Sequence, residues 1–177
     1  MRNIQVCIFL SFVNAFLGIG QDIDHWESVV TEAESWRYLV PSSEPDPLWR
    51  TSGFDDQGWD EGISGFGYGD ADDNTVLQEG TLSVYLRKRF NITDLSVIQE
   101  VLFNMDYDDA FVAYLNGEEI ARDQISGDPP AFNQLSDGLH EALLYQGVSP
   151  ESFSVPLSLL IEGENVLAVQ VHNQSAN

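Results

Sequence analysis

The chain has 177 residues, of which 29 are acidic and seven are basic, so its formal net charge at pH 7 is −22. Such a surface repels the phosphates of nucleic acids and anionic lipids, and it therefore disfavours both as partners. Two interpretations of the charge remain open: an acidic coat that keeps an exported protein soluble, or adaptation to a salty or calcium-rich medium.

Residues 1–20 have the pattern of a secretory signal peptide. Arg2 gives a positive start, an apolar run follows to Phe16, and Gly18 and Gly20 suit a cleavage site before Gln21. The run is shorter than the roughly 20 apolar residues of a spanning helix, so we expect cleavage and no membrane span afterwards. The only cysteine, Cys7, lies in this segment, and the predicted mature chain therefore has no disulfide.

Residues 21–35 are expected to form a short helix or an exposed leader. From residue 36 onward the pattern favours β-strands, beginning with the alternating residues 36–40 and followed by a loop rich in proline and serine at 41–47. Residues 81–92 also alternate, with Val84 and Leu86 on one predicted face and Tyr85 and Arg87 on the other.

A hairpin is predicted at residues 110–122, because Asn116-Gly117 separates two β-rich runs and suits a two-residue turn with positive φ. Residues 164–173 give another apolar strand after a turn at Gly163. Short strands divided by turn residues, without a helical stripe, predict an all-β protein: an antiparallel β-sandwich spanning residues 36–177. The segment ends without a closing strand, so we expect a last strand to be missing and the sequence to be part of a longer chain.

Four stretches carry a resemblance to a known module: "FDDQGWDEGISGFGYGDADDNT", "YLRKRFNI", "DYDDAFVAYLNGEEIAR" and "GENVLAVQVHN". Together they resemble the galactose-binding-like jelly-roll domain of secreted bacterial proteins, and "HEALLYQGVSPESFSV" is similar to the module found in CotH kinase family proteins. The resemblance covers about residues 36–173. It implies a jelly-roll fold, a secreted or cell-surface location and neighbouring domains in the same longer chain. No kinase-like segment is present, so phosphotransfer cannot be assigned to these residues.

The stretch "GFGYGDADDNT" raises the possibility of a metal site. Asp70, Asp72, Asp73 and Asn74 would supply oxygen ligands of the kind that calcium takes. The spacing does not match the EF-hand template, and aspartate and asparagine also serve simply to cap turns. Calcium binding and turn capping both remain open at this loop.

Aromatic and polar residues in loops are the candidates for a ligand site. We expect Trp49, Tyr68, Asp109 and His140 to form a rim that binds a glycan or polysaccharide, whereas Trp59 is expected in the core. The three histidines lie far apart in the sequence and no nucleophile motif appears, so no catalytic residue is predicted. The predicted function is a non-catalytic glycan-binding module, and the alternative is a spacer domain that supports a neighbouring catalytic domain without a ligand of its own.

Overall fold

The computed structural model describes residues 5–13, 24–69 and 73–175, and it confirms an all-β protein with antiparallel main sheets. Among these residues, only short 3-10 helices interrupt the strands, at η1 (Pro47–Arg50), η2 (Leu95–Val97), η3 (Leu144–Gln146) and η4 (Leu157–Leu159). The strands are β1 (Gln5–Val13), β2 (Asp24–Val30), β3 (Ser35–Leu39), β4 (Asp60–Ile63), β5 (Phe66–Gly67), β6 (Thr75–Val76), β7 (Ser83–Ile92), β8 (Ile98–Asp106), β9 (Ala110–Leu115), β10 (Glu118–Asp123), β11 (Glu151–Ser154) and β12 (Gly163–His172).

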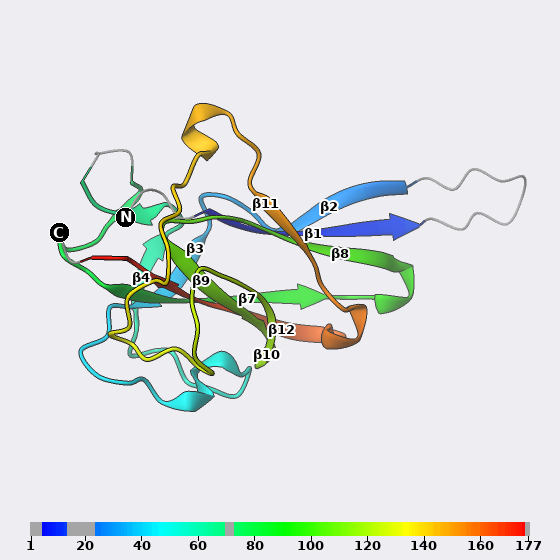
Figure 1. Cartoon of the computed structure of the whole chain (residues 1–177). Coiled ribbons are helices and arrows are strands. Elements are labelled where there is room, and N and C mark those ends of the chain that lie inside the picture. Colours follow the sequence, from blue (N-terminus) through cyan, green and yellow to red (C-terminus); the bar gives the residue numbers. More distant parts are fainter. Residues whose placement is uncertain (1–4, 14–23, 70–72, 176–177) are drawn as a thin grey trace, which may run out of the picture.

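Two sheets form the sandwich (Figure 1). One has the order β10-β9-β12-β7-β3-β4, the other has the order β11-β8-β1-β2, and β5 and β6 form a small parallel pair. The order is not sequential, because β12 lies between β7 and β9. Strand β12 therefore pairs with β9 of the hairpin on one side and with β7 on the other.

Period-2 alternation explains the core. On β7, Val84 and Leu86 point toward the other sheet, and Val169 of β12 and Leu115 of β9 join them with no exposed surface. Facing side chains come from β8, where Phe103 and Met105 are fully buried. This apolar layer between the sheets is the main core.

The opposite face of the six-stranded sheet is also covered. Tyr85 and Tyr114 project from this outer face, and Trp49 and Trp59 pack on it from the loop between β3 and β4. Trp59 is 9% exposed, as expected for a core residue. The two loops that cover this face, residues 40–59 and 124–136, determine where a ligand can approach.

The predicted hairpin is present as β9 and β10. Asn116 and Gly117 both have positive φ, 55° and 99°, which is the backbone that a two-residue type I′ turn requires. The Asn116 side chain also donates to the Leu159 carbonyl at 2.8 Å, and its Oδ1 accepts from the Val166 amide at 2.9 Å. The turn is therefore held by β12 as well as by its own sequence.

The N-terminal part differs from the expectation. Residues 24–30 form strand β2 instead of a short helix or exposed leader, because β1 gives their backbone a hydrogen-bonding partner. Residues 5–13, which fall in the predicted signal peptide, form an inner strand paired with both β2 and β8. Within the described residues, no helix has the length and apolar character needed to cross a membrane.

Candidate functional site

Asp109 and His140 lie together at one end of the sandwich, where the turn between β8 and β9 meets the end of β12. The Asp109 carboxylate accepts the His140 amide at 3.2 Å and the Gln174 amide at 2.8 Å. Both of its oxygens therefore fix backbone segments. Asp109 is 8% exposed, so it anchors loops and offers little surface to a ligand.

His140 is held as firmly as Asp109. Its ring stacks on Tyr107 with centroids 4.0 Å apart and planes 11° from parallel. Nδ1 lies 2.9 Å from the Tyr107 carbonyl oxygen, and Nε2 lies 3.2 Å from Oε1 of Glu151. Both ring nitrogens have protein partners, which makes His140 a positioning residue for the loop after residue 136.

Tyr68 belongs to the same end of the sandwich. Its hydroxyl donates to the Thr81 carbonyl at 3.4 Å and accepts from Nδ2 of Asn173 at 2.9 Å. Burial raises the Tyr68 pKa, and the negative charges of Asp108 and Glu79 add to the effect. The hydroxyl therefore stays protonated and ties Asn173, directly after β12, to the segment that precedes β7.

The structure does not bring Trp49 to this rim. Trp49 is 4% exposed and packs on the outer face of the six-stranded sheet, where its ring meets the edge of Tyr85 at a centroid distance of 4.8 Å. Trp49 therefore lies apart from the predicted rim, and its part in ligand binding stays a prediction. The reason is that Nη1 of Arg87 on β7 donates to the Trp49 carbonyl and holds η1 against the sheet.

The predicted calcium loop is only partly described. Asp70 and Asp72 lie outside the described residues, Asp73 is half-buried, and Nδ2 of Asn74 donates to the Ser64 carbonyl at 2.8 Å. Over the described ranges, no group of three or more acidic, histidine or cysteine side chains is placed to hold a metal ion. Calcium binding by this loop stays a prediction.

Two aspartates at the turn between β8 and β9, Asp106 and Asp109, accept backbone amides. Asp106 accepts the amides of Leu143 and Leu144 at 2.9 and 3.0 Å. Burial raises the Asp106 pKa, and the two backbone hydrogen bonds oppose that shift. With Asp109, this carboxylate fastens the long 136–150 segment to the end of β8.

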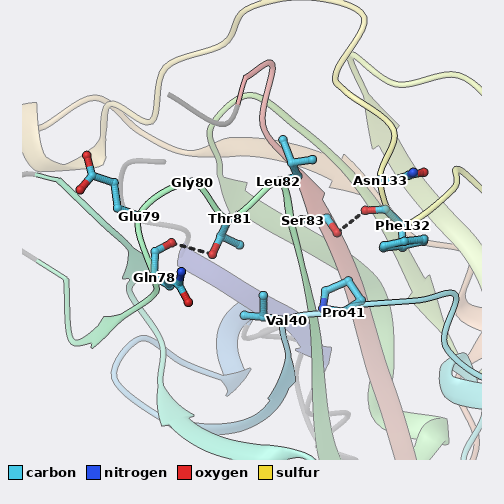
Figure 2. A pocket seen from close by; sticks show the side chains of 10 residues that line it. All are labelled: Val40, Pro41, Gln78, Glu79, Gly80, Thr81, Leu82, Ser83, Phe132 and Asn133. Carbon is cyan, nitrogen blue, oxygen red and sulfur yellow. Dashed lines mark hydrogen bonds between the residues drawn. The ribbon is translucent and has the colours of Figure 1, made fainter.

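A first hollow, the Phe132 hollow, opens beside Tyr68 and has a volume of about 250 Å³. Figure 2 shows Gln78 and Glu79 on one side and Phe132 with Asn133 on the other. The hydroxyls of Ser83 and Thr81 are already engaged, with the carbonyls of Phe132 and Gln78 at 2.6 and 2.7 Å. Its lining residues are Val40, Pro41, Gln78, Glu79, Gly80, Thr81, Leu82, Ser83, Phe132 and Asn133.

A second hollow, the Gln170 hollow, lies over the outer face of the six-stranded sheet and has a volume of about 330 Å³. Gln170 of β12 and Tyr85 of β7 are register partners on this face and line the hollow together. The remaining lining residues are Glu44, Pro45, Pro47, Trp49, Arg50, Pro129, Pro130 and Ala131.

The segment 129–133 divides the two hollows. Pro129, Pro130 and Ala131 line the Gln170 hollow, whereas Phe132 and Asn133 line the Phe132 hollow. Two strand side chains hold this segment, since Ser83 donates to the Phe132 carbonyl and Gln170 donates to the Pro130 carbonyl at 3.1 Å. The two hollows are therefore neighbours over one sheet face.

Sequence reasoning missed both hollows. Tyr85 and Gln170 stand in strands whose alternation correctly gives their face, but the loops that cover that face come from distant parts of the sequence. The available signal was Gln170 itself, an amide in the middle of the apolar run 166–171. Buried amides need hydrogen-bond partners, so such a residue indicates a polar feature on that face of the strand.

Comparison with protein-family models and with curated protein sequences finds no match. Among solved structures, the chain is similar to a β-glucuronidase of Bifidobacterium dentium, complexed with coumarin-3-O-glucuronide, with a TM-score of 0.53 and 17% identity over 95% of this chain. A glycoside hydrolase family 2 β-glucuronidase gives a TM-score of 0.49 and 16% identity over 96% of this chain. The chain spans only 20% and 14% of these two proteins. The first similarity supports the galactose-binding-like β-sandwich as the fold.

Proposed function

We propose that this chain is a non-catalytic accessory module of an exported bacterial protein and that it binds a glycan. The observation that supports this proposal best is the pair of neighbouring hollows over one sheet face. Each combines apolar or aromatic walls with neutral hydrogen-bonding side chains, which is the lining that sugars need, since pyranose rings have apolar C–H faces and a rim of hydroxyls.

The charges of the two hollows agree with an uncharged ligand. The overall charge of −22 works against polyanions, and the described lining contributes one carboxylate to each hollow, Glu79 to the first and Glu44 to the second. Hydrolysis of a glycosidic bond by the common mechanisms takes two carboxyl groups facing each other across the bond. Binding without cleavage is therefore the chemistry that these linings favour.

The setting of the module follows from the sequence patterns. The N-terminal pattern supports export to the medium or the cell surface, and the resemblance to the module of CotH kinase family proteins supports neighbouring domains in the same chain. Calcium bound by Asp70, Asp72, Asp73 and Asn74 would stabilise the loop that follows Gly69. In the sequence, this loop comes shortly before residues 78–83, which line the Phe132 hollow.

One observation favours the alternative of a spacer. The chain corresponds to 20% or less of the two solved proteins described above, so the same fold occurs there as one part of a much larger protein. In that case the module would hold a neighbouring domain in place and the hollows would contain only water.

Binding to immobilised polysaccharides separates the two functions. The protein is applied to an array of soluble plant, fungal and bacterial polysaccharides, with and without added calcium. Saturable retention of the folded protein supports glycan binding. Absence of binding to every polysaccharide under both conditions would leave the spacer function.

Calcium is tested separately by calorimetry. A saturable heat that disappears in the Asp72→Ala, Asp73→Ala double variant supports the ion site. A flat titration of the unaltered protein would leave this loop as a turn.

A further inference from the structure

The floor of the Gln170 hollow contains a buried amide that is only half satisfied. Gln170 is 1% exposed, and its Nε2 donates to the Tyr85 hydroxyl at 2.7 Å and to the Pro130 carbonyl at 3.1 Å. The Pro130 carbonyl can only accept, so the amide orientation is fixed. Its Oε1 then has no partner among the described residues. A buried acceptor of this kind is costly, and a donor from a ligand would satisfy it.

Tyr85 supplies the complementary group. Its hydroxyl accepts the amide of Gln170, so its own proton is available to an acceptor in the hollow. Burial raises the Tyr85 pKa, with the charge of Glu44 adding to the shift, and the hydroxyl therefore stays protonated. The floor offers one acceptor and one donor side by side, which two adjacent hydroxyls of a sugar match because a hydroxyl both donates and accepts.

The walls are rigid and apolar. Pro45 and Pro47 come from one covering loop, and Pro129 and Pro130 come from the other. Trp49 joins them and is itself fixed between Tyr85 and neighbouring rings. Proline and buried tryptophan lose little conformational freedom when a ligand binds, so the site needs little reorganisation to take one.

The two charged side chains that line the hollow have protein partners of their own. The guanidinium of Arg50 sits 4.7 Å from the centre of the Tyr114 ring, and Glu44 accepts the Phe132 amide at 2.9 Å and is exposed. The floor itself is made of a carboxamide and a phenol, both uncharged. The part of a ligand that reaches the floor is therefore uncharged as well.

From this geometry, and resting on the proposed glycan binding, we propose that the Gln170 hollow receives one uncharged sugar ring of a glycan. The volume of about 330 Å³ is at the lower end of the range of about 300–1,000 Å³ for ligand pockets, which suits a single ring. The glycan then continues over the segment 129–133.

The test uses the full chain, labelled with nitrogen-15, and titrates it with methyl pyranosides of galactose, glucose, mannose and N-acetylglucosamine. Binding in the hollow shifts the side-chain amide signals of Gln170 and the indole signal of Trp49. Gln170→Leu removes the floor acceptor at similar size and is expected to weaken binding about tenfold. Gln78→Leu makes the same change in the Phe132 hollow and reports binding there. Gln99→Leu, at an exposed position of β8 outside both hollows, is the matched control, with unchanged affinity expected.

Ala131→Trp is the second variant, because it fills the entrance from an exposed position and leaves the floor intact. Loss of binding in this variant supports the proposal even where Gln170→Leu fails to fold. The assignment to this hollow would be overturned if Gln78→Leu weakened sugar binding while Ala131→Trp and Gln170→Leu left it unchanged. In that case glycan binding itself would stand. Both proposals would be overturned if none of the four pyranosides shifted any signal and the protein bound no polysaccharide on the array.

Discussion

Replacing Arg87 with methionine is expected to destabilise the protein by about 3 kcal/mol, because it leaves a buried carboxylate without its main partner. The Arg87 side chain is 0% exposed, and its Nε donates to Oδ2 of Asp56 at 2.8 Å. Its Nη1 donates to the Trp49 carbonyl and, at 3.2 Å, to the Thr51 carbonyl. One guanidinium therefore holds the covering loop down at three places.

The expected loss of stability follows from the burial of the Arg87–Asp56 pair and from the one cation that remains near Asp56. Removing one member of a buried ion pair costs about 3–5 kcal/mol. The guanidinium of Arg89 lies 3.5 Å from the same Asp56 oxygen and keeps part of the attraction, which places the cost at the lower end. With a slope of about 2 kcal/mol per molar urea, the unfolding midpoint should fall by about 1.5 M.

Urea unfolding followed by tryptophan fluorescence measures this change, and Arg37→Met is the matched control. Arg37 is the register partner of Arg87 on β3, but its pair with Glu61 is 3.5 Å long and largely exposed, with a value of at most about 0.5 kcal/mol. An Arg87→Met variant that loses no more stability than Arg37→Met would refute the reasoning.

Three further changes test other parts of the structure. Gly117→Ala puts a side chain at φ 99° and should cost about 1–2 kcal/mol in urea unfolding, whereas Gly53→Ala, with open space around it, should be close to neutral. Burial lowers the pKa of His172 to about 4, so the neutral ring contributes about 3 kcal/mol that is fully present above pH 6.5 and lost as the pH falls toward 4. The free energy of unfolding, measured from pH 8 to pH 4, should therefore fall less in His172→Asn than in the unaltered protein. Identical pH profiles of the two proteins would contradict this prediction. Asp106→Ala removes the acceptor for two amides at the end of β8, and faster hydrogen exchange at Leu143 and Leu144 than in the unaltered protein should follow, with unchanged exchange as the contrary result.

The strands of the larger sheet were predictable because their signals are local. Alternation in 81–92 gives β7, and Asn116-Gly117 gives the hairpin without any information on tertiary structure. The second sheet was harder to predict. Strand β8 begins within the run 95–102, whose apolar and polar residues follow no clear period, and it is defined mainly by its partners β1 and β11.

The candidate site was less predictable than the fold for a similar reason. Trp49 follows a proline-rich loop and its own sequence predicts an exposed ring, but the buried guanidinium of Arg87 pulls that loop onto the sheet. Arg87 also departs from the usual pattern, since a charged residue on one face of an amphipathic strand predicts contact with solvent. The hollow floored by Gln170 exists only because two separate loops meet above the sheet.

The enclosed position of β1 makes the smaller sheet dependent on the segment that the sequence assigns to export. Its backbone hydrogen bonds run to β2 on one side and to β8 on the other, and Ile8 has no exposed surface between them. A chain cleaved after residue 20 would leave β8 with an unpaired edge, and β2 would lose the strand with which its backbone pairs. Such an edge accepts an added antiparallel strand, so processing of the leader would turn the inner strand β8 into a strand acceptor.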